Sequence, residues 1–214
     1  MTPIYPVNPK LFARILDYME FSKVIRIVDK YEFGRFRILP YVSTVYTAEA
    51  TINPHNLTKC SRVKTLILPN CNMLNNDILM RLPYLESLTM KSGSLITPEI
   101  FQYMSNLSIL QILSSNRFEV NALITDYSLK YLVDLRCLHV SNPVVSLESL
   151  SYLKKLEVLI IENTALTPEI LNYLPNLTMC IVNRTLIKYK SSIRNKDILK
   201  KIEKINHINI YDID

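Results

Sequence analysis

Two stretches of this chain repeat each other: LITPEIFQYMSNLSIL over residues 95–110 and ALTPEILNYLPNLTMC over residues 165–180. Both run from a Thr-Pro-Glu triplet into the pattern L-x-x-L-x-L. The same pattern, with conservative changes, begins at Val42, Val63, Leu85, Leu107, Leu135, Leu156, Leu177 and Ile205. These starting residues are 21, 22, 22, 28, 21, 21 and 28 residues apart. A unit of similar length therefore recurs over most of the chain, which is typical of a solenoid.

Each unit predicts a short strand followed by a short helix. Side chains alternate along a strand, so the apolar residues at places four and six of the pattern point to the same side. In Thr97-Pro98-Glu99, threonine can cap a helix, proline fits its first turn, and glutamate complements its dipole. A strand and helix this short cannot bury their apolar faces alone. The unit therefore predicts stacking around one continuous core.

This pattern resembles the leucine-rich repeat, which has a period of 20–29 residues and the consensus L-x-x-L-x-L-x-x-N/C-x-L. The resemblance covers about residues 42–214. It implies an α/β solenoid with a parallel β-sheet on the concave face and short helices on the convex face. It also implies about seven to eight repeats, of which the last one is capping. The two 28-residue intervals, after Ile112 and after Val182, are expected to be longer convex connections.

The ninth place of the consensus departs from the family. It is occupied by Cys71, Gly93, Ser115, Pro143, Thr164 and Thr185. Asparagine stands one place earlier at Asn70, Asn142 and Asn163. Because the ninth place is never asparagine, we expect an irregular set of repeats that lacks the family's inner ladder of asparagine hydrogen bonds.

Residues 1–41 form a separate segment whose apolar residues have helical spacing. We expect two helices that cover the first strand, because a solenoid's end repeat would otherwise expose its core. The stretch LFARILDYMEFSKVIRI, residues 11–27, is also similar to an F-box, the module that binds the adaptor of a cullin ubiquitin ligase. That resemblance implies an adaptor contact through Leu11, Phe12, Ile15, Leu16 and Met19. The cap is the preferred interpretation, and the F-box is the alternative.

Composition and charge exclude several classes of function. Of 214 residues only two are glycine, Gly34 and Gly93, so a glycine-rich phosphate loop, a dinucleotide fingerprint and a kinase loop are excluded. The formal net charge is +6, but residues 61–187 contain ten basic and ten acidic side chains. The excess lies near the two ends, above all in residues 188–204. This distribution argues against a nucleic-acid track along the molecule.

The sequence gives little support for catalysis or metal binding. The four cysteines show no C-x-x-C spacing, and of the three histidines only His139 lies near a cysteine, Cys137. A thiol and an imidazole two residues apart on a strand are separated by roughly 7 Å, beyond hydrogen-bond reach. We therefore expect no enzyme, no catalytic residue, no cofactor and no metal site. A hydrolase built on Cys137 and His139 is kept as a remote alternative.

The basic segment near the end of the chain is amphipathic. Its apolar residues are Ile193, Ile198, Leu199, Ile202 and Ile205, and the lysines between them fall on the opposite side. We expect a solvated convex face on the last helix, with contact to phosphate or to an acidic protein as the alternative.

The binding surface is predicted from places three, five and seven of each repeat, which should project from the concave sheet. An open sheet face usually carries polar side chains. Here apolar residues are expected at Ile109, Leu113, Val158, Ile160, Met179 and Ile181. We interpret them as an exposed partner-binding patch. The alternatives are that strands simply favour β-branched residues, or that a tail or a second copy covers the patch.

The sequence thus predicts a non-catalytic protein–protein interaction scaffold that binds its partner through the concave sheet. An F-box-type substrate adaptor of a cullin ubiquitin ligase is the second hypothesis. With no signal sequence and no apolar run of about 18 residues, we expect an intracellular, cytoplasmic protein with reduced thiols and no membrane partner. The richness in Ile, Asn, Lys and Tyr is similar to that of proteins from large DNA viruses or AT-rich protists, in which case it would lie in the host cytoplasm or nucleus.

Overall fold

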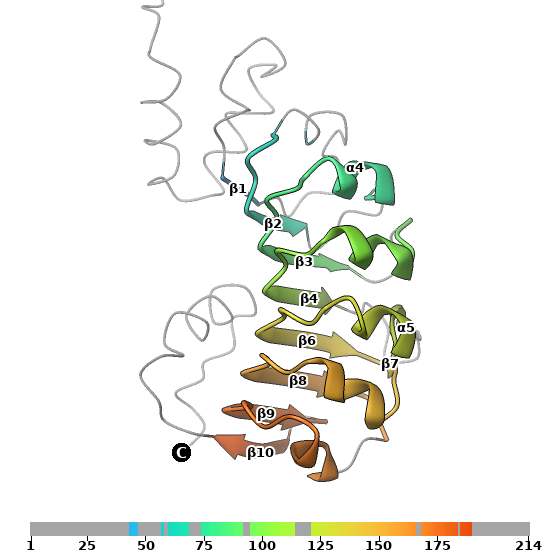
Figure 1. Ribbon diagram of the computed structural model, residues 1–214, viewed down its shortest axis with the longest axis vertical. Coiled ribbons are helices and arrows are strands. Elements are labelled where there is room, and N and C mark those ends of the chain that lie inside the picture. The colour runs from blue at the N-terminus through green and yellow to red at the C-terminus, as the bar shows by residue number, and fades with distance from the viewer. Residues whose placement is uncertain are drawn as a thin grey trace, which may run out of the picture.

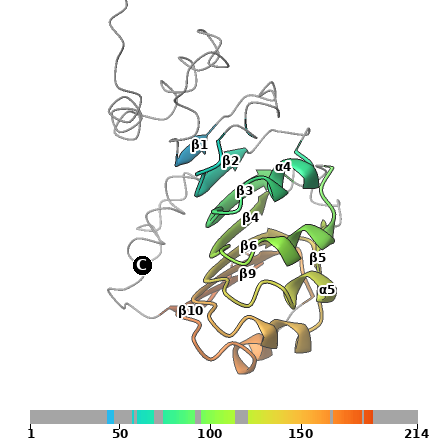
Figure 2. The same cartoon turned by 45° about the horizontal axis from the view of Figure 1, so that its top comes forward.

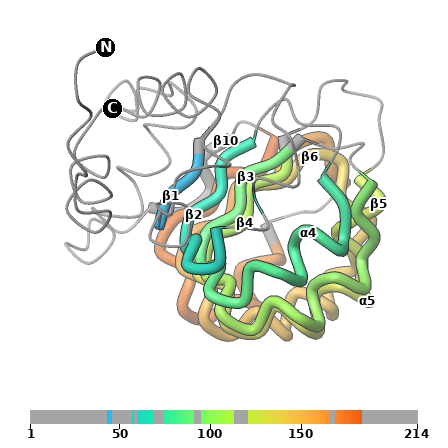
Figure 3. Tube along the Cα trace, turned by 90° about the horizontal axis from the view of Figure 1, so that it is seen from above, coloured from blue at the N-terminus to red at the C-terminus, as the bar shows by residue number. Residues whose placement is uncertain are grey.

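The computed structural model describes residues 43–46, 57, 60–68, 74–91, 95–113, 121–165, 168–183 and 185–189. Within them one turn of chain follows another in a stack, and each turn contributes a strand (Figure 1). Viewed down the stack, successive turns lie over one another, with the strands on one side and the helices on the other (Figure 3). This is the α/β solenoid with a parallel sheet that the repeat predicts.

The main sheet has eight strands in the order β1-β2-β3-β4-β6-β8-β9-β10. All neighbouring pairs from β1 to β9 are parallel, and β10 is antiparallel to β9. The strands are β1 (Thr44–Tyr46), β2 (Thr65–Leu68), β3 (Ser87–Lys91), β4 (Ile109–Leu113), β6 (Cys137–Ser141), β8 (Val158–Glu162), β9 (Met179–Val182) and β10 (Thr185–Tyr189). A parallel order that follows the chain is what stacked repeats produce, because each repeat contacts its neighbours.

The predicted register is confirmed residue by residue. The fourth place of each repeat pairs with the fourth place of the next, and this row consists of Leu66, Leu88, Leu110, Leu138, Leu159 and Cys180. Each of these side chains is at most 1% exposed. They belong to one core that also contains the first and sixth places and the apolar sides of the helices.

Main-chain hydrogen bonds fasten each repeat to the next just before the strand begins. The carbonyl of Glu86 accepts from the backbone N–H groups of Ser108 and Ile109, at 2.8 and 3.0 Å. The carbonyl of Arg136 accepts in the same way from Glu157 and Val158, at 2.8 and 3.0 Å. This recurring pair of bonds satisfies polar backbone at the strand entrance and sets the strand spacing.

The helices of the described ranges lie on one side of the sheet, as predicted, and are very short (Figure 2). Two of these are α-helical, α4 (Asn76–Met80) and α5 (Asp126–Leu129). Three are 3₁₀ turns, η3 (Pro98–Tyr103), η4 (Glu148–Tyr152) and η5 (Pro168–Asn172). None of the helices in the described ranges has the length and hydropathy that a membrane span requires.

The predicted helix start at Thr97 is wrong in one detail. Pro98 occupies the first turn and Glu99 follows it, but the Thr97 side chain makes no capping bond to the helix backbone. Instead Asn76 of the preceding repeat donates to Thr97 Oγ1 at 2.8 Å and accepts from the Thr97 backbone N–H at 3.1 Å. The Thr97 side chain and backbone N–H thus bond to the preceding repeat, while its carbonyl accepts from the Ile100 backbone N–H at 3.2 Å within its own repeat.

The two long intervals differ from each other. The first leads through β5 (Asn121–Thr125), which pairs with β7 (Pro143–Val144) in a separate two-stranded sheet away from the main one. The prediction of a convex connection after Val182 is wrong for residues 185–189. They form β10, because the chain reverses directly after β9 and pairs with it along the outer edge of the sheet. The strand predicted over 205–210 lies outside the described residues.

Asparagine marks the ends of three strands. Asn142, Asn163 and Asn183 have φ of 53°, 53° and 50°, the left-handed region that asparagine tolerates better than other non-glycine residues. The side chain of Asn183 accepts from the Thr164 backbone N–H at 3.1 Å and donates to its carbonyl at 2.8 Å. An asparagine bridge between repeats therefore exists at this position, although the consensus ninth place is threonine.

Candidate functional site

The face of the sheet away from the helices, here called the concave face, carries two rows of side chains. Their order follows from the strand register. The row at place three contains Thr65, Ser87, Ile109, Cys137, Val158 and Met179. The row at place five contains Ile67, Thr89, Gln111, His139, Ile160 and Ile181. One half of the face is thus largely apolar, and the other half is polar.

The apolar half forms a cluster of its own. Ile109, Cys137, Val158, Ile160 and Met179 pack together, and Ile181 packs against them. We call these six residues the concave cluster. The core on the helix side forms a separate cluster, so the packing of the L-x-x-L-x-L pattern does not itself account for the apolar character of these residues. Cys137, which the sequence suggested only as a remote nucleophile, joins Ile109 to the residues on β8 and β9.

The concave cluster is buried, and the prediction that it forms an exposed patch is wrong for most of its members. Val158 and Cys137 are 0% exposed, Ile160 is 4% exposed, and only Ile181 is half-buried. Leu113 lies on β4, but its side chain is outside the described part of the structure. The partner-binding role of these residues stays a prediction. What differs from the expectation is the exposure of these side chains, most of which are buried in this structure.

Polar side chains beside the concave cluster are buried too, but those on β2 are not fully buried. Ser87, Thr89 and Gln111 on β3 and β4 are also buried, whereas Thr65 and Ile67 on β2 are half-buried. The Thr89 hydroxyl donates to Gln111 Oε1 at 3.1 Å, and the Gln111 Nε2 amide has no hydrogen-bond partner among the described residues. The covered part of the face therefore runs from β3 to β9.

Burial favours the neutral forms of Cys137 and His139, the two ionisable residues in these rows. Burial, with a smaller effect of the Glu157 carboxylate, raises the pKa of the Cys137 thiol to about 12. Burial lowers the pKa of His139, and the Glu162 carboxylate partly opposes that shift. A nucleophilic cysteine needs the opposite change, a pKa lowered toward neutrality in a partly exposed site. Cys137 therefore has the chemistry of an apolar side chain.

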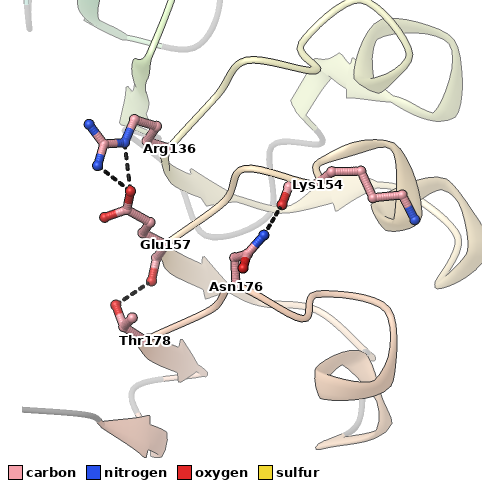
Figure 4. A network of polar contacts seen from close by, with 5 residues as sticks. All are labelled: Arg136, Lys154, Glu157, Asn176 and Thr178. Carbon is pink, nitrogen blue, oxygen red and sulfur yellow. Dashed lines mark hydrogen bonds and ion pairs between the residues drawn. The ribbon is translucent and has the colours of Figure 1, made fainter. Parts of the chain in front are cut away.

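Polar contacts join neighbouring repeats at the points where strands β6, β8 and β9 begin (Figure 4). Arg136 Nε donates to Glu157 Oε1 at 2.6 Å, and the guanidinium Nη2 contacts the same oxygen. Thr178 Oγ1 donates to the Glu157 carbonyl at 2.8 Å, and Asn176 Nδ2 donates to the Lys154 carbonyl at 2.6 Å. These bonds join three repeats, so β6, β8 and β9 present the cluster on a fixed support.

No group of three His, Cys, Asp or Glu side chains in the described ranges is arranged to hold a metal ion. His55, His207 and Cys71 lie outside those ranges, as do Leu11, Phe12, Ile15, Leu16 and Met19 of the N-terminal segment and the lysines predicted on the last helix.

A feature that the prediction missed lies on the helix side. Tyrosine recurs four residues before the first leucine of four successive motifs, at Tyr103, Tyr131, Tyr152 and Tyr173. Tyr103 and Tyr152 are exposed, and Tyr131 and Tyr173 are half-buried against the core. The ring of Tyr131 meets that of Tyr127 edge to face at 5.4 Å. The spacing is visible in the sequence, but it was not among the predicted surfaces.

Comparison with known proteins is consistent with the fold. No protein-family model and no curated protein sequence matches this chain. Among solved structures, Rad7 in the yeast Rad7–Elc1 complex matches with a TM-score of 0.52 and 18% identity. That match covers 81% of this chain and 53% of the Rad7 chain, so the chain spans about half the length of this neighbour.

Two internalins of Listeria monocytogenes are also similar. The internalin InlF has a TM-score of 0.47 and 14% identity, with 69% of this chain and 49% of that chain covered. The internalin C2 has a TM-score of 0.42 and 19% identity, with 65% and 70% covered. At these identities the likeness concerns the fold alone. Together with the parallel sheet, the confirmed register and the short helices, the likeness to Rad7 shows that this chain folds as an α/β leucine-rich-repeat solenoid.

Proposed function

We propose that this protein is a non-catalytic scaffold that binds an apolar segment of a protein partner on its concave face. The observation that carries the proposal is the concave cluster, which is apolar at places where the repeats do not require it. Strand propensity favours β-branched residues at such places, but it does not account for Met179 and Cys137 beside them. Contiguous apolar side chains on a sheet face are typical of a surface that another polypeptide covers.

The shape of the site suits an extended or helical segment rather than a small molecule. The cluster spreads across β4, β6, β8 and β9, and neighbouring strands lie about 4.8 Å apart. A segment crossing these strands would place its own apolar side chains between those of Val158, Ile160 and Met179. Residues of this kind at the centre of an interface usually contribute most of its binding energy.

The remote hydrolase alternative is not supported by the chemistry of the face. The Cys137 thiol stays protonated because burial raises its pKa, and His139 is a buried neutral imidazole. A structural neighbour with this fold, Rad7, is seen in complex with another protein, Elc1, and this supports a role in protein binding. We place the protein inside the cell, in line with the sequence.

The test compares partner capture by two variants that each introduce one aspartate. Ile181→Asp alters the half-buried edge of the concave cluster, and Val133→Asp alters an apolar side chain, 47% exposed, in the turn between α5 and β6. With the tagged full chain, we expect Ile181→Asp to lose the proteins that the unaltered chain captures reproducibly. Val133→Asp should retain them. Loss with Val133→Asp and retention with Ile181→Asp would contradict the proposal and move the interface to the turns between helix and strand.

The F-box hypothesis remains the second candidate and concerns residues outside the described ranges. Its support is the segment LFARILDYMEFSKVIRI, residues 11–27. A direct test is binding of the purified cullin-ligase adaptor to the full chain and to Leu16→Asp. Binding that Leu16→Asp abolishes would favour an F-box. Absence of binding at micromolar adaptor would leave a solenoid cap as the role of this segment.

A further inference from the structure

The tyrosines on the helix side occupy one equivalent place in four successive repeats. They are Tyr103, Tyr131, Tyr152 and Tyr173. The residue after each tyrosine is buried, and its carbonyl accepts from the backbone N–H of the motif's first leucine at 3.0–3.2 Å; these residues are Met104, Leu132, Leu153 and Leu174. Because the same backbone geometry recurs in repeats that stack in register, the four tyrosines form one row, here called the tyrosine stripe.

The fold itself does not require tyrosine at this place. The repeat that contains α4 has Arg81 there, and the same backbone bond forms, from the Leu85 N–H to the Leu82 carbonyl at 3.1 Å. Tyr103 and Tyr152 are exposed, so burial of their rings in the core does not explain them. The stripe therefore has to be explained by something that meets the helix side from outside.

The middle of the stripe already holds a cation. In α5 a second tyrosine, Tyr127, packs against Tyr131, and the Lys130 ammonium nitrogen lies 4.0 Å from the Tyr127 ring centroid and 4.8 Å from that of Tyr131. The face of an aromatic ring attracts a cation within about 6 Å. In the described part of the chain, the rings of Tyr103 and Tyr152 have no such cation over them.

The helices that carry the stripe are acidic. Each of the five described helices has one carboxylate in its first turn and no Lys or Arg within its bounds. Four of these carboxylates stand four residues before the place of the stripe and are exposed; they are Asp77, Glu99, Glu148 and Glu169. The chain as a whole has a formal net charge of +6, so this acidic surface is local.

The rings and the carboxylates of neighbouring repeats lie close together. The helix α5 packs against η3 and against η4. The pKa of Tyr127 is raised, chiefly by its hydrogen bond with Tyr131 and to a smaller degree by Glu99 and Tyr103 of the preceding repeat. A side chain that reached the rings would therefore meet a carboxylate beside them.

We propose that the tyrosine stripe and its carboxylates bind a basic segment of a protein partner. Arg or Lys side chains of that segment lie over the rings of Tyr103 and Tyr152, as Lys130 lies over those of α5, and pair with Glu99 and Glu148. Arginine suits such a site because its planar guanidinium stacks on an aromatic ring and pairs with a carboxylate. This surface is separate from the concave cluster, which lies on the other side of the sheet, and the inference does not depend on the function proposed there.

The test uses a fluorescein-labelled peptide of twelve residues, Gly-Arg-Ser repeated, titrated with the full chain at low salt and followed by fluorescence anisotropy. The comparison peptide has citrulline in place of arginine, which removes the charge and keeps the shape. The positive net charge of the chain disfavours general attraction of the arginine peptide, so binding has to come from a local acidic surface. We expect saturable binding of the arginine peptide and at least tenfold weaker binding of the citrulline peptide. Absence of saturable binding at submillimolar chain would overturn the proposal, as would equal binding of both peptides.

Variants of the stripe show whether the rings make the contact. Tyr103→Leu/Tyr152→Leu keeps apolar volume without the rings and should weaken binding of the arginine peptide about tenfold. Tyr103→Phe/Tyr152→Phe keeps the rings and should bind within about twofold of the unaltered chain. Tyr84→Leu is the matched control, because Tyr84 is 56% exposed, close to the 60% of Tyr103 and the 48% of Tyr152, but lies in the turn between α4 and β3. Unchanged binding by the leucine double variant, or an equal loss with Tyr84→Leu, would overturn the proposal.

The carboxylates and the occupant are tested in the same assay. Glu99→Gln/Glu148→Gln should weaken binding about fivefold at low salt and less at high salt, because salt screens exposed charges; unchanged affinity at low salt would overturn the proposal. Sedimentation of the full chain tests a second copy as the occupant. A dimer that Tyr103→Leu/Tyr152→Leu dissociates would assign the stripe to self-association and overturn the separate partner. Ile181→Asp should bind the peptide normally, so failure here is distinct from failure of the proposed function.

Discussion

The most informative single substitution is Val158→Ala, because its effect depends on whether the concave face is covered. Val158 is 0% exposed although its side chain points away from the helix-side core. Removing two buried carbon groups costs roughly 1.6 kcal/mol of transfer free energy at about 0.8 kcal/mol each. The cavity that remains raises the loss to about 2–3 kcal/mol. On an open face the same change would alter the free energy of unfolding by less than about 0.5 kcal/mol.

Urea unfolding of the full chain measures this loss directly. With a slope near 3 kcal/mol per molar, the midpoint should fall by roughly 0.7–1 M while the slope stays constant. Val133→Ala is the matched control, because Val133 is 47% exposed in the turn between α5 and β6 and should shift the midpoint little. Equal, small effects of both substitutions would refute the reasoning that the concave cluster is buried in solution.

Three further predictions concern the repeats and the buried histidine. Leu138→Ala or Leu159→Ala should each lower the free energy of unfolding by about 2–5 kcal/mol, measured by urea unfolding, and losses below about 1 kcal/mol at both would contradict the repeat register. His139 has a lowered pKa, so the unfolded chain binds more protons and stability should fall as the pH drops below about 6.5. His139→Asn should flatten that part of the stability–pH curve, and an unchanged slope would show that His139 titrates normally. Asn163 has φ of 53°, so Asn163→Val should cost about 1–2 kcal/mol in thermal unfolding and Asn163→Gly much less. Equal effects would contradict the left-handed backbone there.

The repeat architecture could be predicted because its determinants are local and periodic. Leu66, Leu88 and Leu110 occupy the same place of successive motifs, and parallel stacking leaves one in-register solution that buries them all. A slip by one residue would turn the whole apolar row to the wrong face. The helix side followed from the same period, since Ile100 and Ile170 are buried as expected.

Details that depend on contacts between repeats could not be predicted in the same way. The local sequence predicts Thr97 as a helix cap, but the side chain of Asn76, 21 residues earlier, bonds to the Thr97 hydroxyl and backbone N–H. The strand β10 differs from the prediction because the 28-residue interval after Val182 indicates only that the connection is longer. Nothing local in Thr185–Tyr189 distinguishes a returning edge strand from a connection.

The state of the concave face was the largest departure from expectation. A period-two pattern identifies which side chains of a strand leave the core, but it does not say what meets them. The pattern therefore predicts Ile109, Val158 and Met179 to be exposed and equally allows a tail to cover them. Their burial in the folded chain is what the pattern alone does not indicate. The cysteine at place three, by contrast, provides a chemical probe that the sequence alone placed on the correct face.

Native-state alkylation of the unaltered chain tests this account most directly. Cys137 on the concave face and Cys180 in the core are both fully buried. If the concave face is occupied, iodoacetamide should label Cys137 no faster than Cys180, since both then wait for unfolding. Rapid labelling of Cys137 with Cys180 still protected would mean that the concave face is open in solution, and it would contradict the covered surface on which the account depends.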